Sequence, residues 1–313
     1  IKGGYSCFII NVSDEPVYSL DADPDIILAI DKQSLEVYWE DLKKGGTLIY
    51  GYERPIGVKQ IVEELEAKGS KVVHLMTREI AEEFSGNYLM TNVVLAGMLW
   101  KNLGLPWEFL KESIEEKFAS KPKLLAIDLE CAKAGYDRVE TMASLPTAKK
   151  PKEKTLLIDG NKSIALGAIH GGCRAYYAYP MSPASTILTH MSNFANESGV
   201  LVKQGEDEIT VSNMTLGSMY MGTRAMCATS GGGFDLMTET LSLAGITETP
   251  MVVCIAQRPG PGTGLPTWTC QGDLNLAIYS SHGEFPKVVI GCSDPTDCFD
   301  LTQHAFNFAE KYQ

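Results

Sequence analysis

The stretch Asp25-Ile26-Ile27-Leu28-Ala29-Ile30 is a short apolar run that follows a turn-forming Asp-Pro pair. Residues 46–50 and 71–75 are similar runs. Apolar runs of this length, without alternation, are typical of buried strands in a largely parallel sheet. Between the last two runs, residues 57–68 have a helical pattern that closes at a glycine, as a C-cap does. Strand, helix and strand in this order predict an α/β fold.

Further elements continue this pattern in both halves of the chain. In the first half, helices are predicted over residues 92–103 and 106–118. In the second half, the apolar pattern restarts at residues 156–160 and predicts helices over residues 161–171, 206–221 and 296–311 and a strand over residues 250–256. Glycine-rich loops follow the strands of this half, which is where open parallel sheets bind ligands.

The 313 residues are enough for two domains of ordinary size. Apolar periodicity is lost after Tyr136, and residues 147–155 form a charged, proline-containing stretch typical of an exposed linker. We therefore expect one α/β domain over residues 1–146 and a second, with a parallel sheet, over residues 156–313. Because the sequence begins at Ile1 and stops straight after a helical pattern, we expect it to be a piece of a longer chain.

Composition and charge exclude several classes of partner. The hydrophobic fraction of 44% and the charged fraction of 21% are those of an ordinary globular protein. A net charge of -12 offers no basic face for nucleic acid. No apolar run approaches the roughly 20 residues of a membrane helix and no signal pattern is seen, so we expect a cytoplasmic protein. The 8 cysteines include no Cys-x-x-Cys pair, so we expect neither a zinc site nor an iron-sulfur cluster here.

The segment Tyr179-Pro180-Met181-Ser182-Pro183 holds a serine between two prolines. Proline fixes φ and cannot join a strand ladder, so the hydroxyl of Ser182 is left free to point at a ligand. The alternative is a plain strand-to-helix turn in which Ser185 is the N-cap.

Three carboxylates, Glu206-Asp207-Glu208, begin a predicted helix. The helix dipole explains acidic residues at this position without any ligand. The functional alternative is that one of these carboxylates, partly buried, hydrogen-bonds a nitrogen atom of a cofactor.

Two glycine-rich loops lie further along the chain. The run Thr229-Ser230-Gly231-Gly232-Gly233 is typical of a strand that leaves the sheet through a glycine turn, where backbone can approach a ligand closely. It lacks the ending of a P-loop and the spacing of a dinucleotide fingerprint. Arg258 follows the predicted strand 250–256, with hydroxyls at Thr263 and Thr267. A guanidinium there suits bidentate capture of a carboxylate or phosphate, although a structural loop with a surface ion pair is the alternative.

Taken in this order, these segments resemble the alpha subunit of the 2-oxoacid:ferredoxin oxidoreductases. The resemblance extends to residues 271–274 and 282–286, so unrelated motifs fall in the family order at family spacings. The first half looks like the family's gamma domain, fused ahead of alpha and without its N-terminal part. The second half looks like the pyrimidine-type α/β domain of a thiamine enzyme. Met181-Ser182 stands where the family usually has Ile-Thr, and Gly232 stands where it usually has Pro.

The resemblance implies a role for each candidate residue. Glu208 is the catalytic residue that hydrogen-bonds the aminopyrimidine ring of thiamine diphosphate, because its spacing of nine residues to Gly217 resembles that of other thiamine pyrimidine domains; Glu206 is the alternative. Further cofactor contacts are assigned to Tyr179, Pro180, Glu206, Thr229 and Ser230. Substrate contacts are assigned to Ser182, Arg258 and Thr267. No metal ligand is expected on this chain, because Mg²⁺, the diphosphate and a [4Fe-4S] cluster are assigned to a beta subunit.

The implied reaction is oxidative decarboxylation of a 2-oxoacid to its acyl-coenzyme A, with coenzyme A as co-substrate and ferredoxin as electron acceptor. Among substrates 2-oxoglutarate is favoured, since gamma-alpha fusion is common in that branch, and pyruvate and branched-chain 2-oxoacids stay open. The implied assembly is a dimer of alpha-beta units. Two alternatives remain: a transketolase-like or decarboxylase-like thiamine enzyme, which the gamma-like half argues against, and a non-catalytic scaffold, which the presence of Glu208 and Arg258 argues against.

Overall fold

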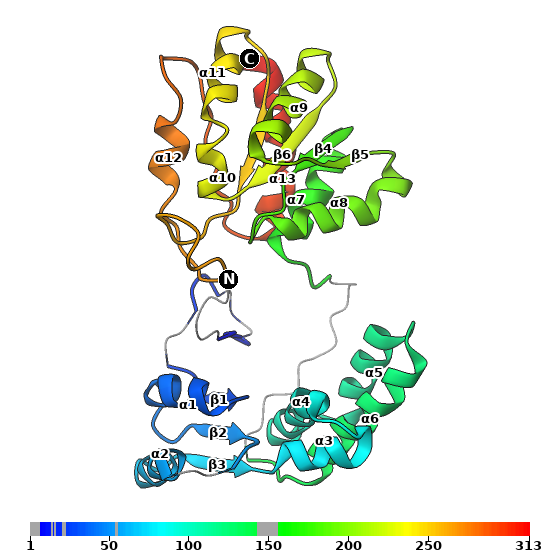
Figure 1. Cartoon of the computed structure of the whole chain (residues 1–313), viewed down its shortest axis with the longest axis vertical. Coiled ribbons are helices and arrows are strands. Elements are labelled where there is room, and N and C mark those ends of the chain that lie inside the picture. Colours follow the sequence, from blue (N-terminus) through cyan, green and yellow to red (C-terminus); the bar gives the residue numbers. More distant parts are fainter. Residues whose placement is uncertain (1–6, 14, 16, 21–22, 54–55, 143–155) are drawn as a thin grey trace. The chain divides into compact units, whose positions relative to one another are not determined.

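The computed structural model describes residues 7–13, 15, 17–20, 23–53, 56–142 and 156–313. The chain forms two compact units that divide near residue 152, and each is described by itself (Figure 1). The predicted linker, residues 147–155, lies outside the described residues.

A three-stranded parallel sheet forms the centre of the first unit, in the order β1-β2-β3. Its strands are β1 (Ile26–Ala29), β2 (Thr47–Tyr50) and β3 (Lys71–His74). The central strand β2 is buried along its whole length, which confirms the strands predicted from the three apolar runs. Helices α1 (Lys32–Tyr38) and α2 (Ile56–Ala67) cover one face through residues such as Leu35 and Val58. Short 3-10 helices occupy Trp39–Asp41 and Tyr88–Met90.

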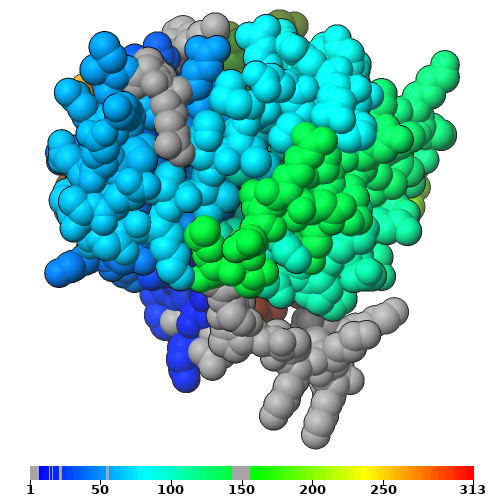
Figure 2. All heavy atoms as spheres, turned by 90° about the horizontal axis from the view of Figure 1, so that it is seen from below, coloured from blue at the N-terminus to red at the C-terminus, as the bar shows by residue number. Residues whose placement is uncertain are grey.

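Four helices complete the first unit: α3 (Thr77–Ser85), α4 (Thr91–Asn102), α5 (Trp107–Phe118) and α6 (Pro122–Asp137). Leu95 and Met98 of α4 cover the second face of the sheet. Helix α6 packs against α3, α4 and α5, and Figure 2 shows its green C-terminal end against cyan residues on this surface.

Helices α4 and α6 approach each other closely at two glycines. A Cβ atom added to Gly97 would lie 2.0 Å from the backbone oxygen of Ala132, and one added to Gly135 would lie 2.1 Å from that of Val94. Because no side chain separates the two backbones at these positions, the helices could not pack this way with any larger residue.

The second unit contains a four-stranded parallel sheet in the order β5-β4-β6-β7. Its strands are β4 (Ala175–Ala178), β5 (Leu201–Gln204), β6 (Ala225–Thr229) and β7 (Val252–Ile255). The connection from β4 to β5 and that from β6 to β7 run in opposite directions across the sheet, so β4 and β6 flank the point where the strand order reverses. The predicted α/β class with a parallel sheet is confirmed.

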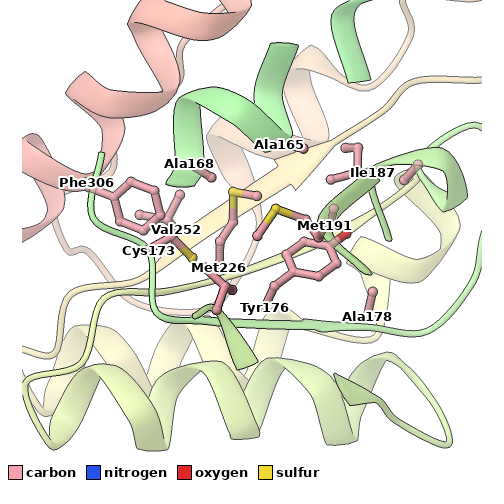
Figure 3. Close-up of a cluster of buried hydrophobic side chains, with 13 residues drawn as sticks. Ala165, Ala168, Cys173, Tyr176, Ala178, Ile187, Met191, Met226, Val252 and Phe306 are labelled. Atoms are coloured by element: carbon pink, nitrogen blue, oxygen red, sulfur yellow. The ribbon is translucent and has the colours of Figure 1, made fainter. Parts of the chain in front are cut away.

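Successive side chains along these strands point to opposite faces of the sheet and are buried in two separate cores. On one face, Tyr176 and Met226 pack against α7 (Gly160–His170), α8 (Ser185–Ser198) and α13 (Pro295–Tyr312), as Figure 3 shows. On the other, Tyr177 and Cys227 face α9 (Glu208–Tyr220), α10 (Gly231–Asp235), α11 (Thr238–Ile246) and α12 (Leu274–Tyr279). Helices thus cover both faces and leave the strand ends open for loops.

The restart of the apolar pattern at residues 156–160 contributes no strand. Leu156 and Leu157 are exposed, and α7 begins at Gly160 with Asp159 as its N-cap, whose side chain accepts a hydrogen bond from the backbone of Lys162 at 2.7 Å. Within the described ranges, no helix is both long and apolar enough to cross a membrane. The described residues also include no group of three or more His, Cys, Asp or Glu that could hold a metal ion.

Gly97→Ala should lower the free energy of unfolding by about 1–3 kcal/mol, because the new Cβ forces α4 away from the backbone of α6. Gly57→Ala, in α2 of the same unit, is the matched control. Its Cβ would lie 3.4 Å from the mobile end of Glu36, so helix propensity should leave stability unchanged or raise it by up to about 1 kcal/mol. Urea unfolding followed by circular dichroism measures both changes, and equal changes would contradict the close packing of α4 on α6.

Candidate functional site

The loops that follow the strands of the second unit meet at one edge of its sheet. All pairs among β4, β5, β6 and β7 are parallel, so their carboxyl ends lie on the same side. The predicted segments follow these ends: residues 179–183 follow β4, residues 206–208 follow β5, and Ser230 and Arg258 follow β6 and β7. This edge, at the reversal of strand order, is where open α/β sheets bind ligands.

The three acidic residues before α9 have three different environments. Glu206 is exposed. Asp207 is the N-cap, and its side chain accepts a hydrogen bond from the backbone of Thr210 at 2.7 Å, which lowers the pKa of Asp207. Capping therefore accounts for Asp207. It does not account for Glu208, which is the first residue of the helix and only 3% exposed.

The carboxylate of Glu208 lacks a partner for one of its oxygens. Its Oε1 atom is buried and has no hydrogen-bond partner among the residues that the structure describes. Because an unpaired buried polar atom costs free energy, nearly all such atoms in folded proteins are satisfied by protein, water or ligand. The Oε1 atom of Glu208 can therefore accept a hydrogen bond from a water or a ligand.

Gly233 lies directly against this carboxylate. A Cβ atom added to it would lie 2.0 Å from Oγ1 of Thr229 and 2.6 Å from Oε1 of Glu208. The hydroxyl of Ser230 is also fully buried and without a hydrogen-bond partner in the described part of the chain. The side chains of Thr229 and Glu208 thus both lie against Gly233, whose backbone N–H donates to the backbone oxygen of Ser230 at 3.0 Å. Their assignment to one cofactor stays a prediction.

The glycine whose spacing motivated the choice of Glu208 does not take part. Gly217 lies within α9, and a Cβ atom there would meet nothing within 4 Å. Nothing in the structure explains the spacing of nine residues. The glycine that borders the carboxylate of Glu208 is Gly233, not Gly217. The run of glycines after β6 is the feature of the sequence that indicates it.

Arg258 joins the loop after β7 to the loop after β4. Its Nη1 atom donates a hydrogen bond to the backbone oxygen of Ser182 at 2.9 Å, and its side chain is 7% exposed. The burial of Arg258 argues against a surface ion pair, and the alternative of a structural loop stays open. The side chain of Ser182 is exposed and makes no contact with this guanidinium among the described hydrogen bonds.

A small pocket of about 130 Å³ lies against Arg258 and Ser230. Asp235 and Asp273 also line this pocket. Burial raises the pKa of Asp273, the carboxylate of Asp235 adds to the rise, and Arg258 opposes it. The pocket therefore combines one guanidinium, one hydroxyl and two carboxyl groups.

Asp273 lies in segment 271–274, to which the family resemblance assigns no role. The structure packs it on the glycine turn, since a Cβ added to Gly231 would lie 2.6 Å from Oδ1 of Asp273. Its backbone N–H donates to Oε1 of Gln257 at 2.9 Å. These contacts hold α12 against the loops after β6 and β7, and no short-range pattern in the sequence indicates them.

The remaining candidates lie at the edge of this arrangement. Tyr179 and Pro180 are exposed at the end of β4. Thr267 is exposed in the loop after Arg258, and none of the described hydrogen bonds joins the two residues. Their assigned roles stay predictions. Ser185 is the first residue of α8 and Ala184 is its N-cap, so the alternative in which Ser185 caps the helix is wrong.

Comparison with known proteins follows the same division of the chain. The family model described as "Pyruvate flavodoxin/ferredoxin oxidoreductase, thiamine diP-bdg" matches residues 166–313. The model described as "Pyruvate ferredoxin/flavodoxin oxidoreductase" matches residues 1–138. The 2-oxoacid:ferredoxin oxidoreductase subunit alpha of a Sulfolobus species is 32% identical, over 100% of this chain and 56% of its own length. The chain belongs to the 2-oxoacid:ferredoxin oxidoreductase family. The resemblance found in the sequence is confirmed.

Other members of the family agree with this placement. The 2-oxoglutarate synthase subunit KorA of Methanothermobacter thermautotrophicus is 41% identical over 50% of this chain and 42% of its own length. A solved 2-oxoglutarate:ferredoxin oxidoreductase from Magnetococcus marinus, with 2-oxoglutarate, coenzyme A and succinyl-CoA bound, has a TM-score of 0.80 and 31% identity. The match covers 95% of this chain and 52% of the Magnetococcus marinus chain. The chain thus spans about half the length of the curated relatives it matches.

Gly233→Ala should destabilise the second unit by about 1–3 kcal/mol, because the added methyl group meets the side chains of Thr229 and Glu208. Gly232→Ala is the matched control one residue away, where a Cβ would meet nothing within 4 Å, and it should change stability by less than about 0.5 kcal/mol. Urea unfolding of the two variants tests this. Equal stability would show that Gly233 does not border the carboxylate.

Proposed function

We propose that residues 156–313 form the pyrimidine-binding half of a thiamine diphosphate site. One observation carries this proposal: the Oε1 atom of Glu208 is buried and has no hydrogen-bond partner among the described residues. The match of residues 166–313 to a thiamine diphosphate-binding family model supports it independently. The donor set also fits an aminopyrimidine, which offers ring nitrogens and an amino group to a carboxylate and to hydroxyls.

Glu208 would hold a proton between its Oε1 atom and a nitrogen of the pyrimidine ring. Its burial excludes water, and a charge-assisted hydrogen bond is stronger in such a low-dielectric site. Ser230 and Thr229 would contact the same ring from the glycine turn, with Tyr179 and Pro180 beside it at the end of β4. Bound thiamine diphosphate supplies the nucleophilic carbon and the electron sink for decarboxylation. Glu206 is exposed and is the weaker candidate for the catalytic role.

Arg258 would bind the carboxylate of the substrate. Its guanidinium has several N–H donors, and the sequence of the loop after β7 contains no other arginine. The hydrogen bond to the backbone oxygen of Ser182 orients it and leaves other donors for a ligand in the adjoining pocket. Thr267 and the hydroxyl of Ser182, both exposed on the same loops, are proposed as further substrate contacts.

We infer that the assembled enzyme oxidatively decarboxylates a 2-oxoacid to its acyl-coenzyme A and reduces ferredoxin. The names of the relatives support this inference, and two of them carry 2-oxoglutarate in their names, which favours that substrate over pyruvate or a branched-chain 2-oxoacid. Mg²⁺, the diphosphate and a [4Fe-4S] cluster are proposed to lie on a beta subunit, since these 313 residues contain no Gly-Asp-Gly motif. A dimer of alpha-beta units in the cytoplasm is part of the same proposal.

Glu208→Gln should lower turnover of the assembled enzyme by about 10²–10⁴-fold, because the amide keeps the shape of the side chain and loses the proton-holding carboxylate. The fold should be unaffected, which thermal unfolding checks. Glu206→Gln, two residues away and exposed, is the control and should keep near-normal turnover. An active Glu208→Gln enzyme together with an inactive Glu206→Gln enzyme would move the catalytic role to Glu206.

Arg258→Ala should lower kcat/KM for the 2-oxoacid by roughly 30-fold to several thousand-fold. Truncating one partner of a buried charge pair costs about 2–5 kcal/mol, and each 1.4 kcal/mol is about tenfold. Arg258→Lys should recover only part of the loss, since an ammonium cannot reproduce the planar fork.

The comparison is made in the assembled enzyme with 2-oxoglutarate and with pyruvate. Arg174→Ala, which removes an exposed arginine before β4, is the matched control and should leave both values unchanged. If kcat/KM in Arg258→Ala stays at the wild-type value for both acids, the loop that begins at Arg258 is structural.

A further inference from the structure

The loop after β4 has few backbone donors with which to hold itself in place. Residues 180 and 183 are both proline, so neither has an N–H group. Within the loop, the carbonyl of Met181 accepts from the backbone of Ser185 at 3.0 Å. The next two carbonyls, those of Ser182 and Pro183, accept hydrogen bonds from side chains of other elements instead.

Two side chains from opposite sides of the loop hold these consecutive carbonyls. As described above, Arg258 donates to the backbone oxygen of Ser182 at 2.9 Å. Asn161, in the first turn of α7, donates from Nδ2 to the backbone oxygen of Pro183 at 2.9 Å and to Oγ1 of Thr186 at 2.5 Å. A loop held at one carbonyl can still turn about that hydrogen bond. Held at two consecutive carbonyls, it keeps one orientation of the Ser182 side chain.

The amide of Asn161 lies on a rigid element. Helix α7 begins with Asp159 as its N-cap, which accepts from the backbone of Lys162 at 2.7 Å. Further along the helix, a Cβ atom added to Gly167 would lie 2.4 Å from the backbone oxygen of Phe299 in α13. Because the backbones of α7 and α13 pack this closely, the Nδ2 atom of Asn161 has little freedom to follow a moving loop.

We propose that Asn161 is a positioning residue for the 2-oxoacid, which holds the loop after β4 so that Arg258 and the hydroxyl of Ser182 face one substrate. This inference rests on the proposed role of Arg258 in binding the carboxylate of the substrate. None of the described hydrogen bonds joins Asn161 to Arg258, so Asn161 acts on the substrate through the loop.

A purely structural role for Asn161 would act through a different bond. Its Nδ2 atom also donates to the hydroxyl of Thr186, which ties α7 to α8. The two roles can be separated because the two bonds have different acceptors. Thr186→Val removes the hydroxyl, keeps the shape of an exposed side chain and leaves the bond to Pro183 in place.

The test measures kcat/KM for the 2-oxoacid in the assembled enzyme. Asn161→Asp keeps the shape of the side chain, but its carboxylate cannot donate to the carbonyl of Pro183. Asn161→Ala and Asn161→Asp should both lower kcat/KM by roughly 5- to 100-fold, because a small displacement of a group that orients the substrate is costly. Asn161→Gln keeps a donor on a longer side chain and should recover part of the loss. Thr186→Val should stay within about threefold of the wild type. Thermal unfolding checks that each variant is folded.

A double-mutant cycle gives a readout that a purely structural contact would not change. If Asn161 acts through the loop that Arg258 also holds, Asn161→Ala should lower kcat/KM much less in an Arg258→Ala background than in the wild type. Lys162→Ala is the matched control, since the side chain of Lys162 makes none of the described hydrogen bonds or ion pairs, and it should have little effect in either background. A purely structural role would give additive effects.

Three results would overturn the inference. The first is an unchanged kcat/KM in both Asn161→Ala and Asn161→Asp. The second is a loss in Thr186→Val as large as that in Asn161→Ala, which would assign the effect to the tie between α7 and α8. The third is additivity in the cycle.

The failure of the proposed function has a different signature. If Arg258→Ala leaves kcat/KM unchanged, the proposed role of Arg258 fails and this inference fails with it. If Arg258→Ala lowers kcat/KM and Asn161→Ala does not, the role of Arg258 stands and only the inference about Asn161 is wrong.

Discussion

The site depends on one constraint, the parallel pairing of four strands that are buried on both faces. Parallel pairing places the carboxyl ends of all four strands at the same end of the sheet. Because helices cover both faces, only this end and the amino-terminal end of the strands are free of helices. Loops far apart in the sequence therefore meet there. The hydrogen bond from Arg258 to the backbone of Ser182 and the contact of Gly233 with Glu208 are both consequences of that geometry.

Much of the fold was predictable because its signals are local. Continuous apolar runs such as residues 46–50 give buried strands, and glycine turns give the loop after β6. Helix α6 escaped prediction, since its contact with α4 is made by small residues such as Ala132 and Gly135, which leave little apolar periodicity. Strand β5 escaped because three of its four residues are exposed and its sequence is not apolar.

The candidate site was predictable in its residue types and less so in its contacts. Three adjacent acidic residues look alike in sequence, and only the fold separates the cap Asp207 from the buried Glu208. The role of Asp273 depends on contacts with Gly231 and with Gln257, both distant in the sequence. Such contacts are set by the sheet order, which no short-range pattern records.

If Glu208 binds a ligand as proposed, its unpartnered carboxylate also couples the folding of the chain to ligand binding. A buried polar atom that is satisfied only by a ligand makes the empty state less stable than the occupied one, so a ligand that fills the gap stabilises the folded chain in proportion to the logarithm of its concentration. If half of that ligand is held by another subunit, assembly shares in the same equilibrium. Under the proposed assignment, folding, ligand binding and subunit association would then be one linked process.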